Sequence, residues 1–502
     1  MRLLPLISIF ICQSLFAQEP YNHRLENGQI QAIAQMVHEL DTTYLGIGRG
    51  LDTIDFLRGI YATEFDKETG EVLNTAKITY PGSILFFDQT KSTLEVDNKP
   101  YFLFSRSDTI YLSSYNILNK KIVIEKKIFA IDPVNSLFIY DFHVKGGIFY
   151  ILSDHTSIKT GISQPVLFTF NPNLNTLTEI YIVNSDERML VPLLSFLDSG
   201  NFIMTYTIAI SNAGIFKIKE FDPDGNDIWT YEHDVIRESS VNAILPIDNN
   251  NFVLGGFKSR ESNDPDNEHI PYLWKFDYVQ KKVVTVSDFN IPNDEWFKFN
   301  SNVTEIIPSQ DNTSFLCTSS LYEFPINPDT LQSFGMIAKV DHDLNVLWRR
   351  QYAFIEGEYY ENNFKDIIAT SDGNYLAYGT STKTFSFPGE VPILSWAIKI
   401  DEDGKIVGDT TTSVVEWEDL DLTDNIEIFP NPASDHIYIN QNDIEDVCYK
   451  VYDLTGRFIE EFTLSDRNQS VVKSVERWNI GYHIIRMEKD GRLIGSMKVL
   501  KI

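Results

Sequence analysis

The sequence predicts an all-β protein in which a seven-bladed β-propeller precedes a small immunoglobulin-like β-sandwich. Three observations support this fold class: two interleaved repeats in the body of the chain, and a series of evenly spaced short strands in its last eighty or so residues. The chain has 502 residues, of which 43% are hydrophobic and 13% aromatic. It can therefore bury a large core, and disorder is not expected.

The first repeat is a short aromatic strand, which recurs at spacings of 57, 48, 53, 50, 63 and 60 residues. Most copies follow turn residues such as Asp372-Gly373, because Asp, Asn and Gly tolerate the dihedral angles of tight turns. A hairpin turn that leads into a strand is therefore expected at every copy. The seven copies begin at Thr43, Pro100, Ile148, Asn201, Asn251, Ser314 and Asn374.

The second repeat lies between these strands. An alternating apolar strand ends in Asp or Asn, a turn follows, and a new strand begins, with an apolar residue usually seven positions after the acid or amide, as from Asp341 to Trp348. Each unit then holds two hairpins, so its turn residues are expected at equivalent positions of the fold. The seven turn residues are Asp66, Asn116, Asn171, Asp222, Asp277, Asp341 and Asp401.

Four strands in a unit of roughly 55 residues are typical of a propeller blade. The coils of a β-helix would be much shorter, and a string of sandwiches would need units of about 100 residues. Seven blades are the first choice. Six or eight are the alternatives, because the outer repeats are the most degenerate.

Strands of the C-terminal sandwich recur every ten or so residues. Asn431-Pro432 bars a helix and predicts a turn, and His436–Asn440 then alternates between polar and apolar residues. Val447–Tyr452 has the same pattern, and Thr455-Gly456 predicts a tight turn before the strand Phe458–Phe462.

Three segments in this region carry a more specific signal: Ile428–Ala433, Val451–Arg457, and Gly481–Met487 continued by Lys498–Ile502. In this order and at these distances they closely resemble the type A C-terminal sorting domain of the bacterial type IX secretion system. An ordinary immunoglobulin-like domain without a role in export is the alternative. The residues that carry the resemblance are Pro430, Asn431, Pro432, Tyr452, Asp453, Gly456, Arg457, Gly481, Arg486 and Lys498.

The resemblance implies passage across the outer membrane by the type IX machinery, then removal of the tail from about Asn425 and transfer to a surface lipopolysaccharide as one outcome. A secretory signal is predicted independently at residues 1–17, because Met1-Arg2 is basic, Leu3–Phe16 is apolar and Ala17 suits signal peptidase. No other apolar stretch is long enough to span a membrane. The mature chain is therefore expected to be secreted or held on the outer-membrane surface, reached through the periplasm.

The acidic charge belongs to the body of the chain. The formal net charge is −29, and residues 425–502 contain ten Lys/Arg and twelve Asp/Glu, so residues 1–424 carry −27. Such a body repels phosphate backbones, which excludes nucleic acid, and favours cationic or cation-bridged partners. The predicted domains are the signal 1–17, the propeller 18–412, an acidic linker 413–424 and the sorting domain 425–502.

No catalytic, cofactor-binding or metal-binding residue is predicted. The acidic segments Asp222–Asp227 and Asp401–Gly404 have the spacing of calcium loops but fall at expected turns, so Ca²⁺ is only the alternative interpretation. The histidines stand singly, without the pairs of a zinc site. The tryptophans on predicted strands are assigned to the core rather than to a sugar-binding platform, the cluster Gly46–Gly50 to a bend, and the three cysteines to no disulfide framework.

The first repeat unit carries a second resemblance, to a family of enzymes. Tyr44-Leu45-Gly46, Gly59-Ile60-Tyr61 and Phe65–Gly70 resemble the opening blade of lactonase-type seven-bladed propellers, over some thirty residues. The second blade departs from that family's Pro-Ser and Asp-Gly pattern, and a blade signature indicates fold rather than activity. The preferred function is a secreted binding module for an extracellular polymer or protein. The alternative is a hydrolase or lyase, lactonase-like or glycan-active, with acids at the central channel.

Overall fold

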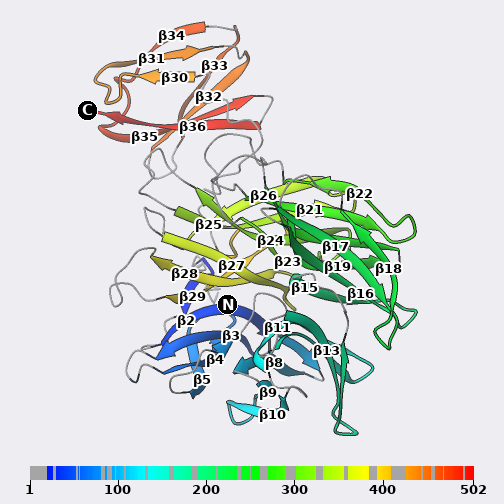
Figure 1. The fold of residues 1–502 in the computed structure, drawn as a ribbon. Coiled ribbons are helices and arrows are strands. Elements are labelled where there is room, and N and C mark those ends of the chain that lie inside the picture. Colours follow the sequence, from blue (N-terminus) through cyan, green and yellow to red (C-terminus); the bar gives the residue numbers. More distant parts are fainter. Residues whose placement is uncertain are drawn as a thin grey trace, which may run out of the picture. The chain divides into compact units, whose positions relative to one another are not determined.

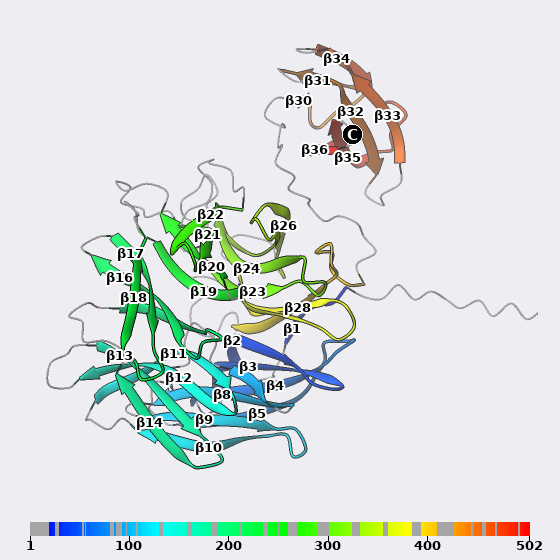
Figure 2. The ribbon, with the colours of Figure 1, turned by 90° about the vertical axis from the view of Figure 1, so that its right-hand side faces the viewer.

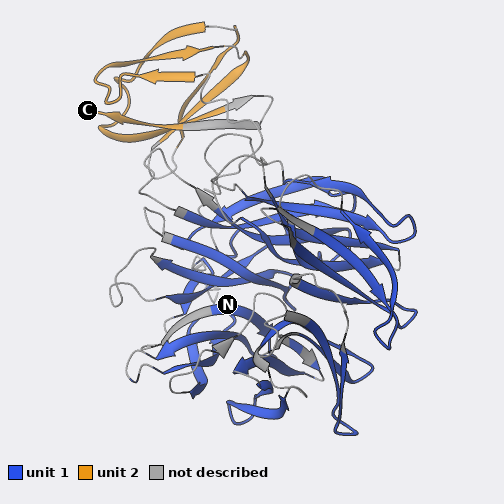
Figure 3. Ribbon diagram, viewed as in Figure 1, with its two compact units in different colours: residues 1–413 blue, residues 414–502 orange. Residues whose placement is uncertain are grey.

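The computed structural model describes residues 20–25, 30–52, 55, 57–80, 85–86, 93–96, 98–106, 109–129, 134–157, 163–181, 189–210, 213–233, 239–248, 250–259, 269–289, 301–323, 332–354, 360–383, 393–408, 426–442, 445–453, 458–466, 469–489 and 492–502. Every regular element among them is a β-strand, which confirms the all-β prediction. The chain forms two compact units, residues 1–413 and 414–502 (Figure 3). The predicted signal at 1–17 and the predicted linker at 413–424 lie outside the described residues.

The first unit is a propeller of seven antiparallel sheets, called blades 1 to 7, in which the strands follow one another from the axis outward (Figure 1). In blade 2 the innermost position is divided between β6 and β7, which both pair with β8. Blades 1 to 3 consist of β2(Ile30–Glu39), β3(Thr43–Asp52), β4(Arg58–Asp66), β5(Val72–Tyr80); β6(Leu85–Phe86), β7(Thr93–Val96), β8(Lys99–Arg106), β9(Thr109–Asn116), β10(Lys121–Phe129); and β11(Val134–Lys145), β12(Ile148–Ser157), β13(Ser163–Asn171), β14(Thr176–Tyr181).

The remaining blades repeat this order, and blade 7 takes its fourth strand from the start of the chain. Blades 4 to 7 consist of β15(Met189–Phe196), β16(Phe202–Ile210), β17(Ala213–Phe221), β18(Asp227–Glu232); β19(Ser239–Asp248), β20(Asn251–Ser259), β21(His269–Asp277), β22(Lys282–Ser287); β23(Val303–Pro308), β24(Ser314–Glu323), β25(Gln332–Asp341), β26(Val346–Tyr352); and β27(Tyr360–Ala369), β28(Tyr375–Lys383), β29(Leu394–Ile400), β1(Asn22–Leu25).

The ring is closed by β1, which pairs antiparallel with β29 (Figure 2). The side chain of Tyr21 is buried and its hydroxyl donates to the carbonyl oxygen of Asp66 at 3.0 Å, while Trp396 Nε1 donates to Asn22 Oδ1 at 2.6 Å. This strand falls within the predicted propeller range 18–412, but the strand itself was not predicted. Four residues cannot show a period, and their partners in β29 lie at least 370 residues further along the chain, as from Leu25 to Ser395.

The two predicted repeats correspond to fixed positions in the blades. The aromatic repeat marks the second strand of each blade, and the acid or amide marks the turn after the third strand. In blades 1 to 6 this turn leads into the fourth strand, whereas in blade 7 the fourth strand is β1. At this turn the side-chain oxygen accepts a backbone N–H from three or four residues further on, so the predicted equivalence is confirmed. The acceptors and donors are Asp66–Thr69, Asn116–Asn119, Asn171–Leu174, Asp222–Asn226, Asp277–Gln280, Asp341–Asn345 and Asp401–Lys405.

Charged side chains link several blades at this same end. The residue two positions before the turn acid reaches the corresponding turn of the next blade. Glu64 meets Lys120 at 3.2 Å, and Glu220 meets Lys281 at 3.7 Å. In blades 5 and 6 the acid and the base exchange positions: Lys275 meets Asp343 at 3.2 Å, and Lys339 meets Glu402. The turns after the third strands therefore lie together at one end of the propeller.

The glycine cluster Gly46–Gly50 is part of β3, so the predicted bend is wrong. A Cβ atom on Gly46 would lie 2.3 Å from the Tyr378 hydroxyl oxygen, so glycine is required where the tyrosine of blade 7 packs against blade 1. The predicted core role of the tryptophans is consistent with their burial, since Trp274 and Trp396 are fully buried between blades.

The second unit consists of two antiparallel sheets that enclose one core. One sheet has the order β30-β31-β34 and the other β33-β32-β35-β36. The strands are β30(Ile426–Phe429), β31(His436–Gln441), β32(Val447–Asp453), β33(Phe458–Leu464), β34(Gln469–Ser474), β35(Gly481–Lys489) and β36(Arg492–Lys501).

Candidate functional site

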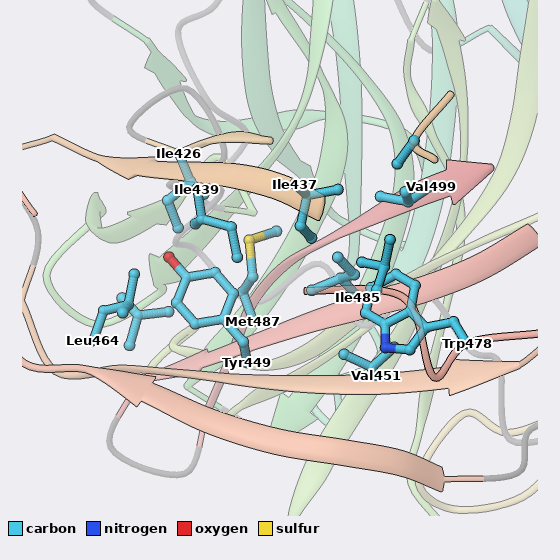
Figure 4. Packing of buried hydrophobic residues seen from close by; sticks show 13 residues of the cluster. Ile426, Ile437, Ile439, Tyr449, Val451, Leu464, Trp478, Ile485, Met487 and Val499 are labelled. Carbon is cyan, nitrogen blue, oxygen red and sulfur yellow. The ribbon is translucent and has the colours of Figure 1, made fainter. Parts of the chain in front are cut away.

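The C-terminal unit has its own closed core, as expected for an independently folded sandwich. Alternate residues of the facing strands point inward, and Tyr449, Val451 and Ile485 are fully buried between the sheets (Figure 4). Trp478 completes the core, and its indole Nε1 donates to Glu460 Oε1 at 2.8 Å. Glu460 lies in the predicted strand Phe458–Phe462, but Trp478 and its bond to Glu460 were not predicted, because the segment before β35 has no strand or turn pattern of its own.

The Pro-Asn-Pro turn is joined to the C-terminal strand. Asn431 Nδ2 donates to the carbonyl oxygen of Lys498 at 2.8 Å, and the backbone N–H of Leu500 donates to Asn431 Oδ1 at 2.9 Å. Ala433 continues the contact: its N–H donates to Leu500 O at 2.8 Å and its carbonyl accepts from Ile502 N at 2.9 Å. The first and the last predicted signal segments are therefore one structural element.

The remaining signal residues lie on the second sheet. Tyr452 stands opposite Ile484, and Arg486 stands opposite Lys450. Gly481 opens β35 at a φ of 134°, which favours glycine. For Asp453 only the backbone, in β32, is described, while Gly456 and Arg457 lie outside the described residues. The structure thus brings Pro430, Asn431, Pro432 and Lys498 together at one end of β36, and Tyr452 and Arg486 onto neighbouring strands.

The channel of the propeller is the second candidate site. In blades 1 and 3 to 7 the first strand has a β-bulge opposite the second strand, at an equivalent position along the strand in each blade. At this bulge one residue of the first strand has no partner in the register, or two residues in blade 4. In blade 2 the break between β6 and β7 falls at this level. The extra residues are Gln35, Tyr140, Val191 with Pro192, Asn242, Thr304 and Lys365.

Two acids beside these bulges link successive blades. Asp141 Oδ2 accepts the backbone N–H of Leu194 at 2.7 Å, and Asp366 Oδ2 accepts that of Val37 at 2.8 Å. In each case the donor follows the bulge of the next innermost strand. Burial, followed by the positive charge of Arg49, lowers the pKa of Lys365 below its ordinary value.

One carboxylate–imidazole pair lies on an innermost strand. His143 Nε2 is 2.9 Å from Asp141 Oδ2, Asp141 is buried, and the imidazole packs edge-on against Phe196. Asp366 makes the same link between blades, but Ile368 stands where blade 3 has the histidine. The imidazole is therefore not needed to join the blades. A carboxylate that orients a partly exposed histidine is suited to general-base chemistry.

The carboxylates of the acidic turns are engaged within their own turns. Asp222 and Asp401 use their Oδ1 atoms to accept the backbone N–H groups of their own turns. Among the residues that the structure describes, no three His, Cys, Asp or Glu side chains are grouped so as to hold a metal ion. Nor does the described part of the chain contain a helix that could cross a membrane.

Similarity to known proteins is confined to the fold and the C-terminal unit. No curated protein matches the chain. Similar solved structures include the Pan2 WD40 domain of Neurospora crassa (11% identity, 73% of this chain and 89% of that one, TM-score 0.41), the polysaccharide lyase Uly1 (9%, 74% and 90%, 0.43) and the α-L-arabinofuranosidase Arb93A of Fusarium graminearum (8%, 77% and 100%, 0.37).

The C-terminal match is the specific one. Residues 427–501 match the family model of the secretion system C-terminal sorting domain, and they coincide with the sandwich and its joined Pro-Asn-Pro and C-terminal segments. The predicted resemblance is thereby confirmed. Residues 427–501 are a sorting domain of the type IX secretion system, and the chain is a secreted or outer-membrane surface protein with a propeller body.

Proposed function

We propose that the propeller is an extracellular ligand-binding module and that its ligand face is the end opposite the acid-capped turns. The observation that carries this proposal is an asymmetry in the length of the connections. At the capped end all connections have two to five residues. At the other end, blades 5 to 7 carry the connections 260–268, 288–302, 324–331 and 384–393. Long connections on a rigid scaffold are where binding residues usually lie.

Binding assays with the tail-free body test this proposal. Phe385→Ala with Phe387→Ala, in the connection between β28 and β29, should weaken binding to whichever surface glycan or basic protein the body retains in a screen with and without calcium. The control is Leu118→Ala, because Leu118 is 97% exposed in a turn at the capped end. Equal binding by both variants, or a loss only with Leu118→Ala, would place the ligand elsewhere.

The body's charge of −27 indicates how this binding should respond to salt. Cationic partners, or partners bridged by divalent cations, are favoured, and their binding should weaken steeply as salt screens long-range attraction. Salt-insensitive binding to a neutral glycan would contradict the electrostatic part of the proposal. Binding of nucleic acid would contradict it as well.

The tail is proposed to direct export through Pro430, Asn431, Pro432, Gly456, Arg457 and the other signal residues, and to be cut off near Asn425 afterwards. A chain ending at Asp424 should accumulate in the periplasm instead of reaching the surface or medium. Export of this truncated chain at the level of the full one would refute the proposal.

A hydrolase or lyase is the second candidate, because the Asp141–His143 pair could act as an oriented general base. His143→Gln should then abolish turnover of a lactone or glycoside by the tail-free body. Ile368→Gln, at the equivalent position of blade 7, should leave turnover unchanged. Turnover that persists in His143→Gln would remove the pair from the mechanism.

A further inference from the structure

One face of the sorting domain carries an apolar row that the domain's own core does not use. This outer sheet face belongs to β33-β32-β35-β36 and is defined by Phe458, Tyr452, Ile484, Tyr482, Lys450, Arg486, Lys498, Glu461 and Glu488. Phe458 pairs with Tyr452, Tyr452 with Ile484, and Ile484 with Lys498, so these four side chains cross all four strands in one line. The alternate residues Tyr449, Val451 and Ile485 point the other way and are buried.

The apolar side chains of the outer sheet face are open to solvent. Phe458 is 53% exposed, Tyr482 45% and Ile484 38%. Tyr452 and Phe458 pack edge to face with ring centroids 5.8 Å apart, and Lys498 Nζ lies 4.3 Å from the centroid of Tyr482. The exposed rings are thus held in place by neighbouring strands rather than by flexible loops. A contiguous, ordered apolar patch of this kind marks an interaction site.

The charge of the face is opposite to that of the rest of the chain. Lys450, Arg486 and Lys498 against Glu461 and against Glu488, which follows Arg486 by two positions in β35, give it +1. Residues 425–502 as a whole carry −2, and the body carries −27. The rings and the arginine are residue types enriched at the centres of protein interfaces. The cations disfavour a basic partner. They favour a partner surface on which carboxylates surround exposed apolar side chains.

We propose that the outer sheet face is the surface by which the sorting domain docks on an acidic protein of the outer-membrane export machinery. This inference rests on the proposed export role of the tail. A protein is favoured over a lipid surface because the described side chains form a flat row across four paired strands. A second copy of this chain is disfavoured because two such faces would bring like charges together.

The full chain with paired substitutions tests the proposal. Phe458→Ser with Ile484→Ser removes the apolar row, and Lys450→Glu with Lys498→Glu reverses its charge. Val472→Ser is the matched control, since Val472 is 58% exposed on the other sheet. Both paired variants should lower the amount exported by about tenfold or more, the effect of losing a central interface anchor. Val472→Ser should be exported like the unsubstituted chain, and thermal unfolding should be unchanged in all variants.

A photo-crosslinking amino acid at position 484 identifies the partner. The proposal requires an adduct with an outer-membrane protein that disappears in the charge-reversed variant. An adduct with lipopolysaccharide, with a second copy or with the propeller body would overturn it, as would normal export of both folded paired variants. If instead the chain ending at Asp424 were exported normally, the export role itself would fail. If that truncation blocks export and the face variants do not, only the docking inference fails.

Discussion

At the scale of single residues, the side chains that set the repeat are structural acceptors. Asp311, for example, accepts hydrogen bonds from the Ser309 hydroxyl and the Thr313 N–H, which lower the pKa of its carboxyl to about 2. Backbone and side-chain donors likewise lower the pKa of Asp66 and Asp222. The turn residues could be predicted from the sequence because each contact is made within a few residues of the acid.

The turn acid of blade 1 should contribute measurably to stability. Asp66→Ala removes the acceptor of the Glu68 and Thr69 N–H groups and should lower the free energy of unfolding by about 1 kcal/mol. Glu68 lies in the same turn, but its side chain accepts neither of these two hydrogen bonds. Glu68→Ala should therefore leave the free energy of unfolding unchanged. Urea unfolding measures both, and equal effects of the two substitutions would contradict the capping role.

The lowered pKa values also set a pH dependence. A carboxyl whose pKa is lower in the folded than in the unfolded chain stabilises the fold above the unfolded pKa of about 4, and this contribution is lost as the pH falls through the folded pKa. For Asp311 that window runs from about 4 down to about 2. Asp311→Asn should therefore be less sensitive to pH in this window. Identical dependence of urea midpoints on pH in both proteins would refute this.

At the scale of elements, local patterns revealed the hairpins, and features that depend on distant pairing were not predicted. The second strands and the acid-capped turns lie within single repeats, so their composition marks them. Strand β1 and the bulges at Gln35, Asn242 and Lys365 depend on how one strand pairs with another, which no local period records. The hydrogen bond from Asn431 to Lys498 also joins distant parts of the chain. The sequence predicted both motifs, but it did not predict the contact between them.

Closure of the ring should depend on β1. Deleting residues 18–25 removes the buried side chains of Tyr21 and Leu25, which should cost about 4 kcal/mol, and leaves the outer edge of β29 unpaired. The melting temperature should fall. Adding a peptide of residues 18–26 should restore it, whereas a scrambled peptide should not. An unchanged melting temperature after the deletion would show that β1 does not secure the ring.

At the scale of the whole molecule, the chain has two cores that share no residue. The sandwich core runs from Ile426 to Val499, and the other core clusters all belong to the propeller. The acidity is divided in the same way, since almost all of it lies before residue 425. The sequence revealed the export route because its motifs are local and specific. The sequence did not identify the ligand, because the channel is lined by strands from every blade and a local motif cannot show which residues meet there.

The two cores predict two separate unfolding transitions. Ile485→Ala in the sandwich and Leu254→Ala in blade 5 each remove a fully buried side chain and should each cost about 3 kcal/mol. The first should lower only the transition of the sorting domain, and the second only that of the propeller. Calorimetry of the full chain measures both. A single transition displaced by either substitution would show that the units unfold together.

The position of the closing strand also imposes an order on biosynthesis. β1 leaves the ribosome first, and its partner β29 is complete only at Ile400. At about 5–20 residues per second this leaves β1 unpaired for roughly 20–80 s, while blades 1 to 6 can already form. A cellular factor that holds the N-terminal segment during this interval would delay the final pairing alone. The chain can therefore be engaged at its leading end without preventing most of its body from folding.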